Sequence, residues 1–192
     1  MSAPGTRPLF LIGFMCCGKT TLGRALATAL RVPFTDLDDE VCRRAGAADV
    51  NEIFATRGEA GFRALETQAL RDIVGRPSGS SADAPAKPRA IIACGGGTPC
   101  QPGNMELMLG GGTVVWLDAG IDCLVRRLAV YGDSRPLVRG LGADELRRYV
   151  CDTLARRRAF YGRAHVHFDS SELEDAAQVE ASVRRFIASV IS

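Results

Sequence analysis

The 192-residue sequence predicts an α/β protein, a parallel sheet with helices on both faces. Two observations lead to this prediction. Short apolar runs, typical of buried strands, alternate along the chain with stretches whose apolar residues have helical spacing. The first apolar run also leads directly into a glycine-rich turn followed by a helix, a context typical of nucleotide-binding α/β proteins. The length fits one domain, and we expect residues 1–192 to form it.

The N-terminal elements follow from apolar spacing and turn residues. We expect strands at Leu9–Ile12 and Phe34–Asp38, and helices at Thr20–Leu30, Asp38–Ala45, Asp49–Phe54 and Glu59–Val74. Asp49 and Glu52 have the spacing of a capping box, which predicts the start of the third of these helices. Gly58 is expected to separate it from the fourth.

The C-terminal elements follow a low-complexity stretch at about residues 76–89, which we interpret as a mobile surface insertion. We expect strands at Ala90–Cys94, Thr113–Leu117 and Val166–Phe168, and helices at Ile121–Ala129, from near Asp144, and around Val179, Val183 and Phe186. The glycine- and arginine-containing segment of about residues 130–142 lies between two of these helices.

A phosphate-binding loop is predicted at Gly13–Thr20, which reads G-x-x-x-x-G-K-T between the first strand and the first helix. Gly13 and Gly18 allow the backbone to curl so that several N–H groups point inward at phosphate oxygens. The helix start adds its positive dipole end. Lys19 can reach the β- and γ-phosphates, and the Thr20 hydroxyl can bind Mg²⁺. The sequence therefore predicts that the protein binds a nucleotide.

The composition argues against several other classes of protein. A formal net charge of +2 is too small to indicate a nucleic-acid or membrane surface, and neither a membrane span nor a signal peptide is visible. The seven cysteines form no C-x-x-C pair, so we expect reduced thiols rather than a zinc site or disulfides. We favour a structural role for His165 and His167 over metal binding. We therefore expect a soluble cytosolic protein with no nucleic-acid or membrane partner.

Acidic residues follow two of the predicted strands, at whose carboxyl ends the ligands of parallel sheets bind. Asp36 and Asp38 follow the second strand. We predict that one carboxylate faces a metal and the other a second substrate, on the interpretation that the two alternate in direction along an extended backbone. Asp118 also follows a strand, but we interpret it as the cap of the next helix.

Two further groups of residues are candidates for a binding site. Arg63 and Glu66 are neighbours on one helix face, although this spacing by itself favours a surface ion pair. Gly95, Gly96 and Gly97 follow a strand, and three consecutive glycines suit a backbone that approaches a ligand closely.

Six motifs extend from about Leu9 to the C-terminus. They are GFMCCGKT, Asp36-Leu37-Asp38, Phe62-Arg63-x-x-Glu66, Gly95-Gly96-Gly97-Thr98-Pro99, Arg135-Pro136-Leu137 and Arg157-x-x-x-Tyr161. In their order and approximate spacing, the chain resembles the shikimate kinases. The resemblance implies a three-layer P-loop kinase fold and transfer of the ATP γ-phosphoryl group to the 3-hydroxyl of shikimate, with Mg²⁺, to give shikimate 3-phosphate and ADP.

The resemblance also implies roles for the matching residues. Asp38 would act on the shikimate hydroxyl as general base or orienter. Thr20 and Asp36 would hold Mg²⁺. Arg135 would belong to a lid, at about residues 130–142, that closes over ATP. The residues implied as catalytic are Lys19, Asp38 and Arg135. The residues implied to bind the nucleotide are Gly13, Cys16, Cys17, Gly18, Lys19, Thr20, Thr21 and Arg135. The residues implied to bind shikimate are Asp38, Arg63, Glu66, Gly95, Gly96, Gly97 and Arg157.

Cys16 and Cys17 depart from the family pattern, which usually carries glycine and then alanine or serine at these positions. A side chain at Cys16 would alter the loop or crowd phosphate, which leaves a catalytically weak nucleotide-binding regulator as an alternative. A gluconate-type P-loop kinase of similar size is a second alternative. Because both thiols lie beside Lys19 and a helix N-terminus, we predict redox-sensitive thiolates, with inert buried thiols as the alternative. We expect a monomer whose partners are shikimate and ATP.

Overall fold

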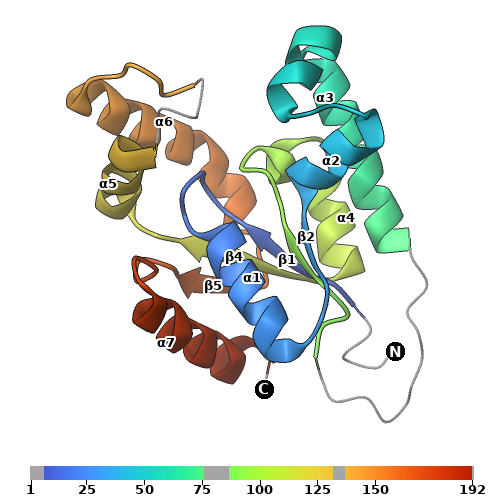
Figure 1. Cartoon of the computed structure of the whole chain (residues 1–192), viewed down its shortest axis with the longest axis vertical. Coiled ribbons are helices and arrows are strands. Elements are labelled where there is room, and N and C mark those ends of the chain that lie inside the picture. The colour runs from blue at the N-terminus through green and yellow to red at the C-terminus, as the bar shows by residue number, and fades with distance from the viewer. Residues whose placement is uncertain (1–6, 76–86, 132–136, 192) are drawn as a thin grey trace.

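The computed structural model describes residues 7–75, 87–131 and 137–191 (Figure 1). Five parallel strands form one sheet in the order β2-β3-β1-β4-β5. The strands are β1 (Leu9–Ile12), β2 (Phe34–Asp36), β3 (Ile91–Ala93), β4 (Thr113–Asp118) and β5 (Val166–Asp169). The helices are α1 (Lys19–Leu30), α2 (Leu37–Ala45), α3 (Val50–Gly75), α4 (Asn104–Gly111), α5 (Ile121–Tyr131), α6 (Ala143–Tyr161) and α7 (Ala176–Phe186), with short turns η1 (Thr98–Cys100) and η3 (Ile187–Ile191). The predicted α/β fold is confirmed.

The central strand β1 is buried on both faces of the sheet. Its four residues are at most 2% exposed, and successive side chains point to opposite faces. Leu9 and Leu11 pack in one core with residues of α1, α5 and α7, whereas Phe10 and Ile12 pack in a second core with residues of α2, α3 and α4. A continuous apolar run is therefore what this position requires, because neither face of the strand meets water.

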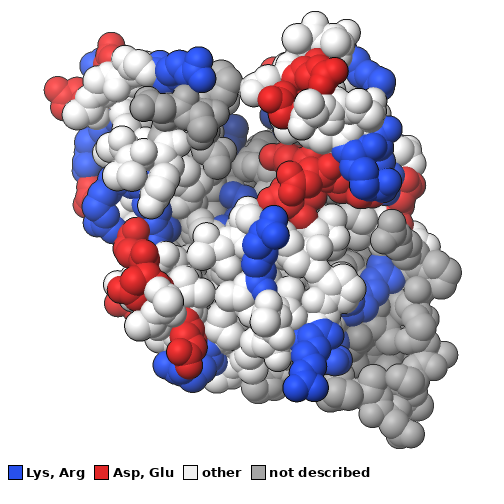
Figure 2. Space-filling model, in the orientation of Figure 1, with Lys and Arg blue, Asp and Glu red and all other residues white. Residues whose placement is uncertain are grey.

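The parallel register brings the loops after β1, β2 and β3 to one edge of the sheet. Leu11 lies opposite Ala93 of β3, which in turn lies opposite Asp36 of β2. Above this edge the molecule is hollowed between α6 and α3, and acidic side chains gather on the α2 side (Figure 2). The first turn of α2 itself contains three acidic residues, Asp38, Asp39 and Glu40.

The structure differs from the sequence-based expectations in two places. Helix α4 and the turn η1 were not predicted, because the apolar residues of α4 form no single stripe and glycines follow them. Strand β2 ends at Asp36, so Asp38 lies on a helix and not on extended backbone. The predicted break at Gly58 is confirmed, since its φ of 68° and ψ of 177° interrupt the helical path of α3.

Two predicted segments lie wholly or partly outside the described residues. These are residues 76–86 of the insertion and residues 132–136, which include Arg135. None of the described helices is both long and apolar enough to cross a membrane.

Candidate active site

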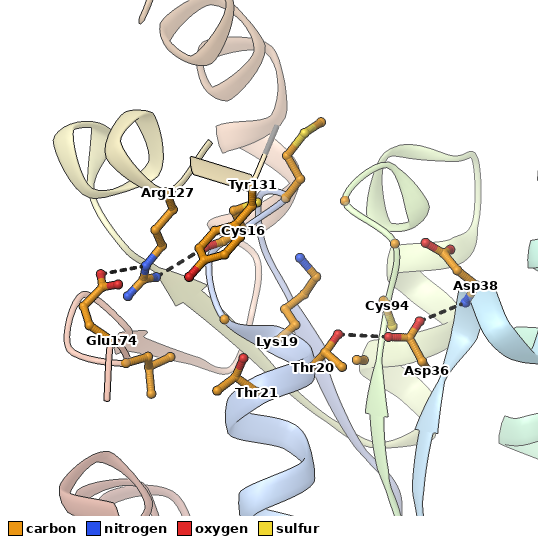
Figure 3. A pocket seen from close by; sticks show the side chains of 16 residues that line it. Cys16, Lys19, Thr20, Thr21, Asp36, Asp38, Cys94, Arg127, Tyr131 and Glu174 are labelled. Carbon is orange, nitrogen blue, oxygen red and sulfur yellow. Dashed lines mark hydrogen bonds and ion pairs between the residues drawn. The ribbon is translucent and has the colours of Figure 1, made fainter. Parts of the chain in front are cut away.

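The predicted phosphate loop connects β1 to α1, and its glycines have backbone angles that other residues rarely adopt. The φ angles are 142° at Gly13 and 97° at Gly18. A Cβ atom on Gly13 would lie 2.5 Å from the Leu117 carbonyl oxygen, so the close contact with β4 also requires glycine. The Lys19 Nζ donates to the carbonyl oxygens of Gly13 at 3.0 Å and Phe14 at 2.7 Å. The ammonium group is thereby held within the curl of the loop (Figure 3).

The two loop cysteines differ in their surroundings. Cys16 has a φ of 60°, in the left-handed region, which accounts physically for the glycine usual at this position in the family. Its side chain is partly exposed and lines the cavity beside the loop. Cys17 is fully buried, and burial raises the pKa of its thiol despite the nearby Lys19 ammonium. The predicted thiolate is therefore wrong for Cys17, which fits the alternative of an inert buried thiol.

Thr20 and Asp36 meet where α1 faces the end of β2. The Thr20 hydroxyl donates to Asp36 Oδ2 at 3.0 Å (Figure 3). Asp36 is also the N-cap of α2, because its Oδ1 accepts the backbone N–H of Asp38 at 3.2 Å. The interpretation that Asp36 and Asp38 alternate along a strand is therefore wrong, because Asp38 lies on a helix and because residues two apart on a strand share a face. The helix turn, not the strand pleat, separates their carboxylates.

The Asp38 carboxylate is largely enclosed. Its Oδ1 is buried and has no hydrogen-bond partner among the described residues. Burial above all, and then the negative charges of Asp36 and Glu66, raise the pKa of Asp38 to about 6, against the lowering effects of Lys19 and Arg63. This carboxylate therefore has an unused acceptor oxygen and a raised affinity for a proton.

The three consecutive glycines lie where four charged side chains converge. A Cβ atom on Gly95 would lie 2.8 Å from Glu66 Oε1 and 2.9 Å from Asp38 Oδ1. One on Gly96 would lie 3.0 Å from Arg157 Nη1, and one on Gly97 would lie 2.8 Å from Arg63 Nη2. The structure thus brings together Asp38, Arg63, Glu66 and Arg157 around residues 95–97. Any side chain on these glycines would occupy the space of those groups.

Arg63 and Glu66 do not form the surface ion pair that their spacing by itself favoured. Glu66 is 0% exposed, and its Oε2 accepts from Arg63 Nη1 at 3.0 Å. Its Oε1 accepts from the buried Thr98 hydroxyl. The buried Glu66 therefore holds the Arg63 guanidinium, and Arg63 lines a cavity.

Tyr161 supports the opposite side of the glycine triplet. It is fully buried, and its hydroxyl donates to the Gly96 carbonyl oxygen at 2.6 Å. Burial raises the pKa of this phenol, so the hydroxyl keeps its proton. Tyr161 stands one helical turn after Arg157, so the same turn of α6 contacts Gly96 twice.

Two cavities meet at Asp38. One, of about 410 Å³, is lined by the phosphate loop, Thr20, Thr21, Asp36 and Asp38, with Arg127 and Glu174 at its far end. The other, of about 890 Å³, is lined by Asp38, Arg63 and the apolar side chain of Phe54. Among the described residues that line these cavities, only Met15 and Asp38 line both.

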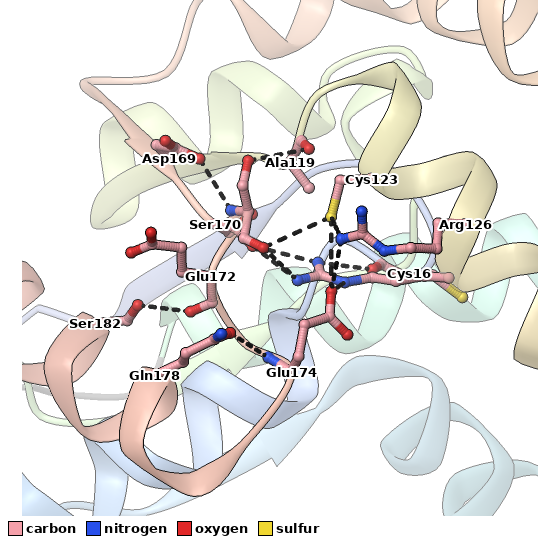
Figure 4. A network of polar contacts seen from close by, with 12 residues as sticks. Cys16, Ala119, Cys123, Arg126, Asp169, Ser170, Glu172, Glu174, Gln178 and Ser182 are labelled. Atoms are coloured by element: carbon pink, nitrogen blue, oxygen red, sulfur yellow. Dashed lines mark hydrogen bonds and ion pairs between the residues drawn. The ribbon is translucent and has the colours of Figure 1, made fainter.

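Arg127 of α5 is a site residue that was not found from the sequence. Its side chain is buried, and its guanidinium donates to Glu174 Oε1 at 3.0 Å and to the Cys16 carbonyl oxygen at 3.3 Å (Figure 3). Figure 4 labels three of its partners, Cys16, Ser170 and Glu174, within the surrounding polar network. The Arg127 guanidinium also donates to the carbonyl oxygens of Ser170 and Ser171. It thus links the phosphate loop to the segment after β5. An arginine on the apolar stripe of a predicted helix is the signal that could have revealed it.

Asp118 and the two histidines contact backbone and core groups. Asp118 Oδ1 accepts the N–H of Gly120, so it closes the turn before α5 and, contrary to the prediction, does not cap the helix itself. His165 Nδ1 accepts the N–H of Val114, and the His167 ring packs on Trp116 at 4.6 Å between centroids. The contacts of the two histidines fit the structural role predicted for them.

Comparison with known proteins identifies relatives along nearly the whole chain. The sequence model of the shikimate kinase family matches residues 15–189. Shikimate kinase from Bacteroides thetaiotaomicron is 41% identical over 177 residues, covering 92% of this chain and 94% of the relative. Shikimate kinase from Novosphingobium aromaticivorans is 40% identical over 164 residues, covering 85% and 79%.

Solved structures give the same result. A crystal structure of the Bacteroides thetaiotaomicron shikimate kinase superposes with a TM-score of 0.82 at 38% identity and covers 95% of this chain and 96% of its own. A structure of shikimate kinase from Acinetobacter baumannii in complex with shikimate superposes with a TM-score of 0.76 at 28% identity, covering 96% and 93%.

Proposed function

The chain belongs to the shikimate kinase family, and from this premise we propose how its residues transfer the γ-phosphoryl group of ATP to the 3-hydroxyl of shikimate. One observation carries the proposal: Asp38 borders both the cavity of the phosphate loop and the cavity that contains Arg63. Phosphoryl transfer requires the attacking oxygen, the phosphorus and the leaving oxygen to lie in line. The boundary between the two cavities supplies that meeting point.

The nucleotide occupies the cavity of the phosphate loop. The backbone from Gly13 to Gly18 surrounds the phosphates, and Lys19 leaves its carbonyl partners to contact the β- and γ-phosphates. Thr21 lines the same cavity, with Arg127 at its far end. Cys16 and Cys17 contribute backbone N–H groups. The Cys17 side chain is buried, whereas the Cys16 side chain lines the cavity.

Mg²⁺ fits the oxygen atoms of Thr20 and Asp36. A hydroxyl and a carboxylate 3.0 Å apart are hard donors of the kind that this ion prefers. Mg²⁺ usually keeps several waters and takes only one or two protein carboxylates, with substrate phosphates completing its coordination. When bound, the ion neutralises negative charge on the phosphates.

Shikimate enters from the second cavity, which Arg63 lines, and reaches its boundary with the first cavity, where Arg157 lies beside Gly96. Its carboxylate points toward these two arginines. These guanidinium groups approach the glycine triplet from α3 and α6, so they can contact a carboxylate from two sides. Glu66 orients Arg63. The glycines at 95–97 leave the acceptor in direct contact with backbone.

Asp38 receives the proton of the 3-hydroxyl as that oxygen bonds to the γ-phosphorus and ADP leaves. Its buried, unpartnered Oδ1 supplies an acceptor oxygen for the hydroxyl. A pKa of about 6 lies close to neutral pH, where a general base is both ionised and basic enough to work. We assign Arg135 to the transferring phosphoryl group, as the resemblance implies, although it lies outside the described residues.

A coupled ADP-release assay with shikimate, with gluconate and with no acceptor tests the acceptor assignment. We expect turnover with shikimate alone. Turnover with gluconate at a comparable kcat/KM would contradict it. We also propose a cytosolic monomer that forms one domain over residues 1–192. The single five-stranded sheet formed by the described strands supports the one-domain assignment. Size-exclusion chromatography with light scattering tests the oligomeric state.

A further inference from the structure

Thr98 occupies a fixed position directly after the glycine triplet. It is 0% exposed, and its backbone N–H donates to the Gly95 carbonyl oxygen at 3.1 Å. Its carbonyl oxygen accepts from the Nδ2 of Asn104, which is also fully buried, at 3.1 Å. With both backbone groups bonded, the Thr98 hydroxyl is directed at one partner, Glu66 Oε1.

Glu66 is held at both carboxylate oxygens. Thr98 donates to Oε1, and Arg63 Nη1 donates to Oε2 at 3.0 Å. A carboxylate bonded at both oxygens cannot rotate, so its orientation sets the plane of the guanidinium that it binds. The second ion pair of Arg63, with Glu59, is longer at 3.4 Å, and Glu59 is 70% exposed, so it constrains Arg63 less.

The acidic surroundings of Glu66 make a hydrogen bond from the Thr98 hydroxyl more important for the position of this carboxylate. Glu66 Oε1 and Asp38 Oδ1 approach the same side of Gly95, and like charges there repel. Thr98 Oγ1 lies on that side too, 3.1 Å from where a Gly95 Cβ would stand. A neutral donor at this point holds the Glu66 carboxylate in place without adding a positive charge beside Asp38.

We propose that Thr98 is a positioning residue for the acceptor: its hydroxyl fixes Glu66, and Glu66 in turn fixes the Arg63 guanidinium against the shikimate carboxylate. This inference rests on the proposed assignment of Arg63 to the acceptor. Thr98 itself contacts backbone groups and Glu66. Its effect on acceptor binding is therefore transmitted by Glu66 to Arg63.

The first experiment compares Thr98→Val, which keeps the shape and removes the donor, with Thr98→Ser, which keeps the donor. Loss of a hydrogen bond to a charged group should raise the shikimate KM about five- to twenty-fold, with the ATP KM and kcat within about two-fold. Thr98→Ser should restore the shikimate KM. Ser182→Ala is the control, because it removes another buried hydroxyl, one bonded to the Glu172 carbonyl oxygen. It should leave the shikimate KM unchanged.

The second experiment repeats Thr98→Val in an Arg63→Ala background. If Thr98 acts through Arg63, the further change in shikimate KM should be less than about two-fold. Additive effects, a normal shikimate KM in Thr98→Val, or equal increases in the KM of both substrates would overturn the inference. Should Thr98→Val fail to fold, Thr98→Ala is measured against the same criteria. An unchanged shikimate KM in Arg63→Ala itself would instead refute the acceptor assignment, and this inference with it.

Discussion

Replacing Arg63 with alanine should have two separable effects, one on stability and one on acceptor binding. Glu66 is 0% exposed, and Arg63 is its charged partner. Removing one partner of a buried ion pair costs about 3–5 kcal/mol, because the other charge stays buried. Arg63 is 21% exposed, so water can enter part of the space it leaves, and we expect a loss of about 2–3 kcal/mol in the free energy of unfolding.

The effect on binding has a different origin. Arg63→Ala also removes a charge-assisted hydrogen bond to the shikimate carboxylate, worth about 1.5–3 kcal/mol, which corresponds to an increase of about 10- to 150-fold in the shikimate KM. The ATP KM should barely change. Arg63→Lys keeps a positive charge beside Glu66 and should recover most of the stability. It should remain impaired in binding, because an ammonium cannot reproduce the planar fork of a guanidinium.

The double variant Arg63→Ala/Glu66→Gln separates the two effects. The amide carries no charge, so the free energy of unfolding should recover by about 1–2 kcal/mol relative to Arg63→Ala. The shikimate KM should stay high. Denaturant unfolding can be followed by the fluorescence of Trp116, the single tryptophan, which is 4% exposed. A double variant that regained shikimate affinity, or an Arg63→Ala variant as stable as the wild type, would refute the reasoning.

Three further predictions concern other parts of the site. Asp38→Asn should lower kcat by about 10²–10⁴-fold while leaving ATP affinity nearly intact, which single-turnover kinetics and ATP titration would test. Hydrogen bonds from Arg43 and, less strongly, Arg44 lower the pKa of Glu40 to about 2. The contribution of Glu40 to the free energy of unfolding is therefore complete above its ordinary pKa and is lost as pH falls toward 2. Glu40→Gln should therefore cost about 1–2 kcal/mol at pH 7, and urea unfolding across pH 2–7 should show this difference closing in acid. Cys16→Gly should be about 0.5–1 kcal/mol more stable than Cys16→Ala in the same assay, because only glycine relieves the left-handed backbone.

Sequence reasoning succeeded where the chemistry lies in one short segment. The phosphate loop needs a strand, glycines that can adopt unusual φ angles, a lysine and a helix start, and all of these are contiguous in the chain. The strands were also readable, because β1 and β3 are buried on both faces and appear as continuous apolar runs.

The acceptor side could be predicted less completely, because its residues meet only in the folded chain. The spacing of Arg63 and Glu66 fits an exposed ion pair as well as a buried one, and only the packing of α3 against η1 shows that Glu66 is inaccessible. The position of Asp38 on a helix depends on where β2 ends. Arg127 was missed because its four partners lie up to 111 residues away in sequence.

Arg63 and Arg157, the two arginines of the proposed acceptor site, differ in their surroundings, although the sequence motifs imply the same role for both. Arg63 is paired with the buried Glu66, so that the two side chains together carry no net charge. Within the described part of the chain, Arg157 has no acidic partner, and its guanidinium lies 5.8 Å from the centroid of the Phe14 ring and beside Gly96. We therefore propose that Arg157 supplies the net positive charge that attracts the acceptor carboxylate. In this proposal Arg63, with its plane fixed by Glu66, supplies the orientation that turns the acceptor hydroxyl toward Asp38.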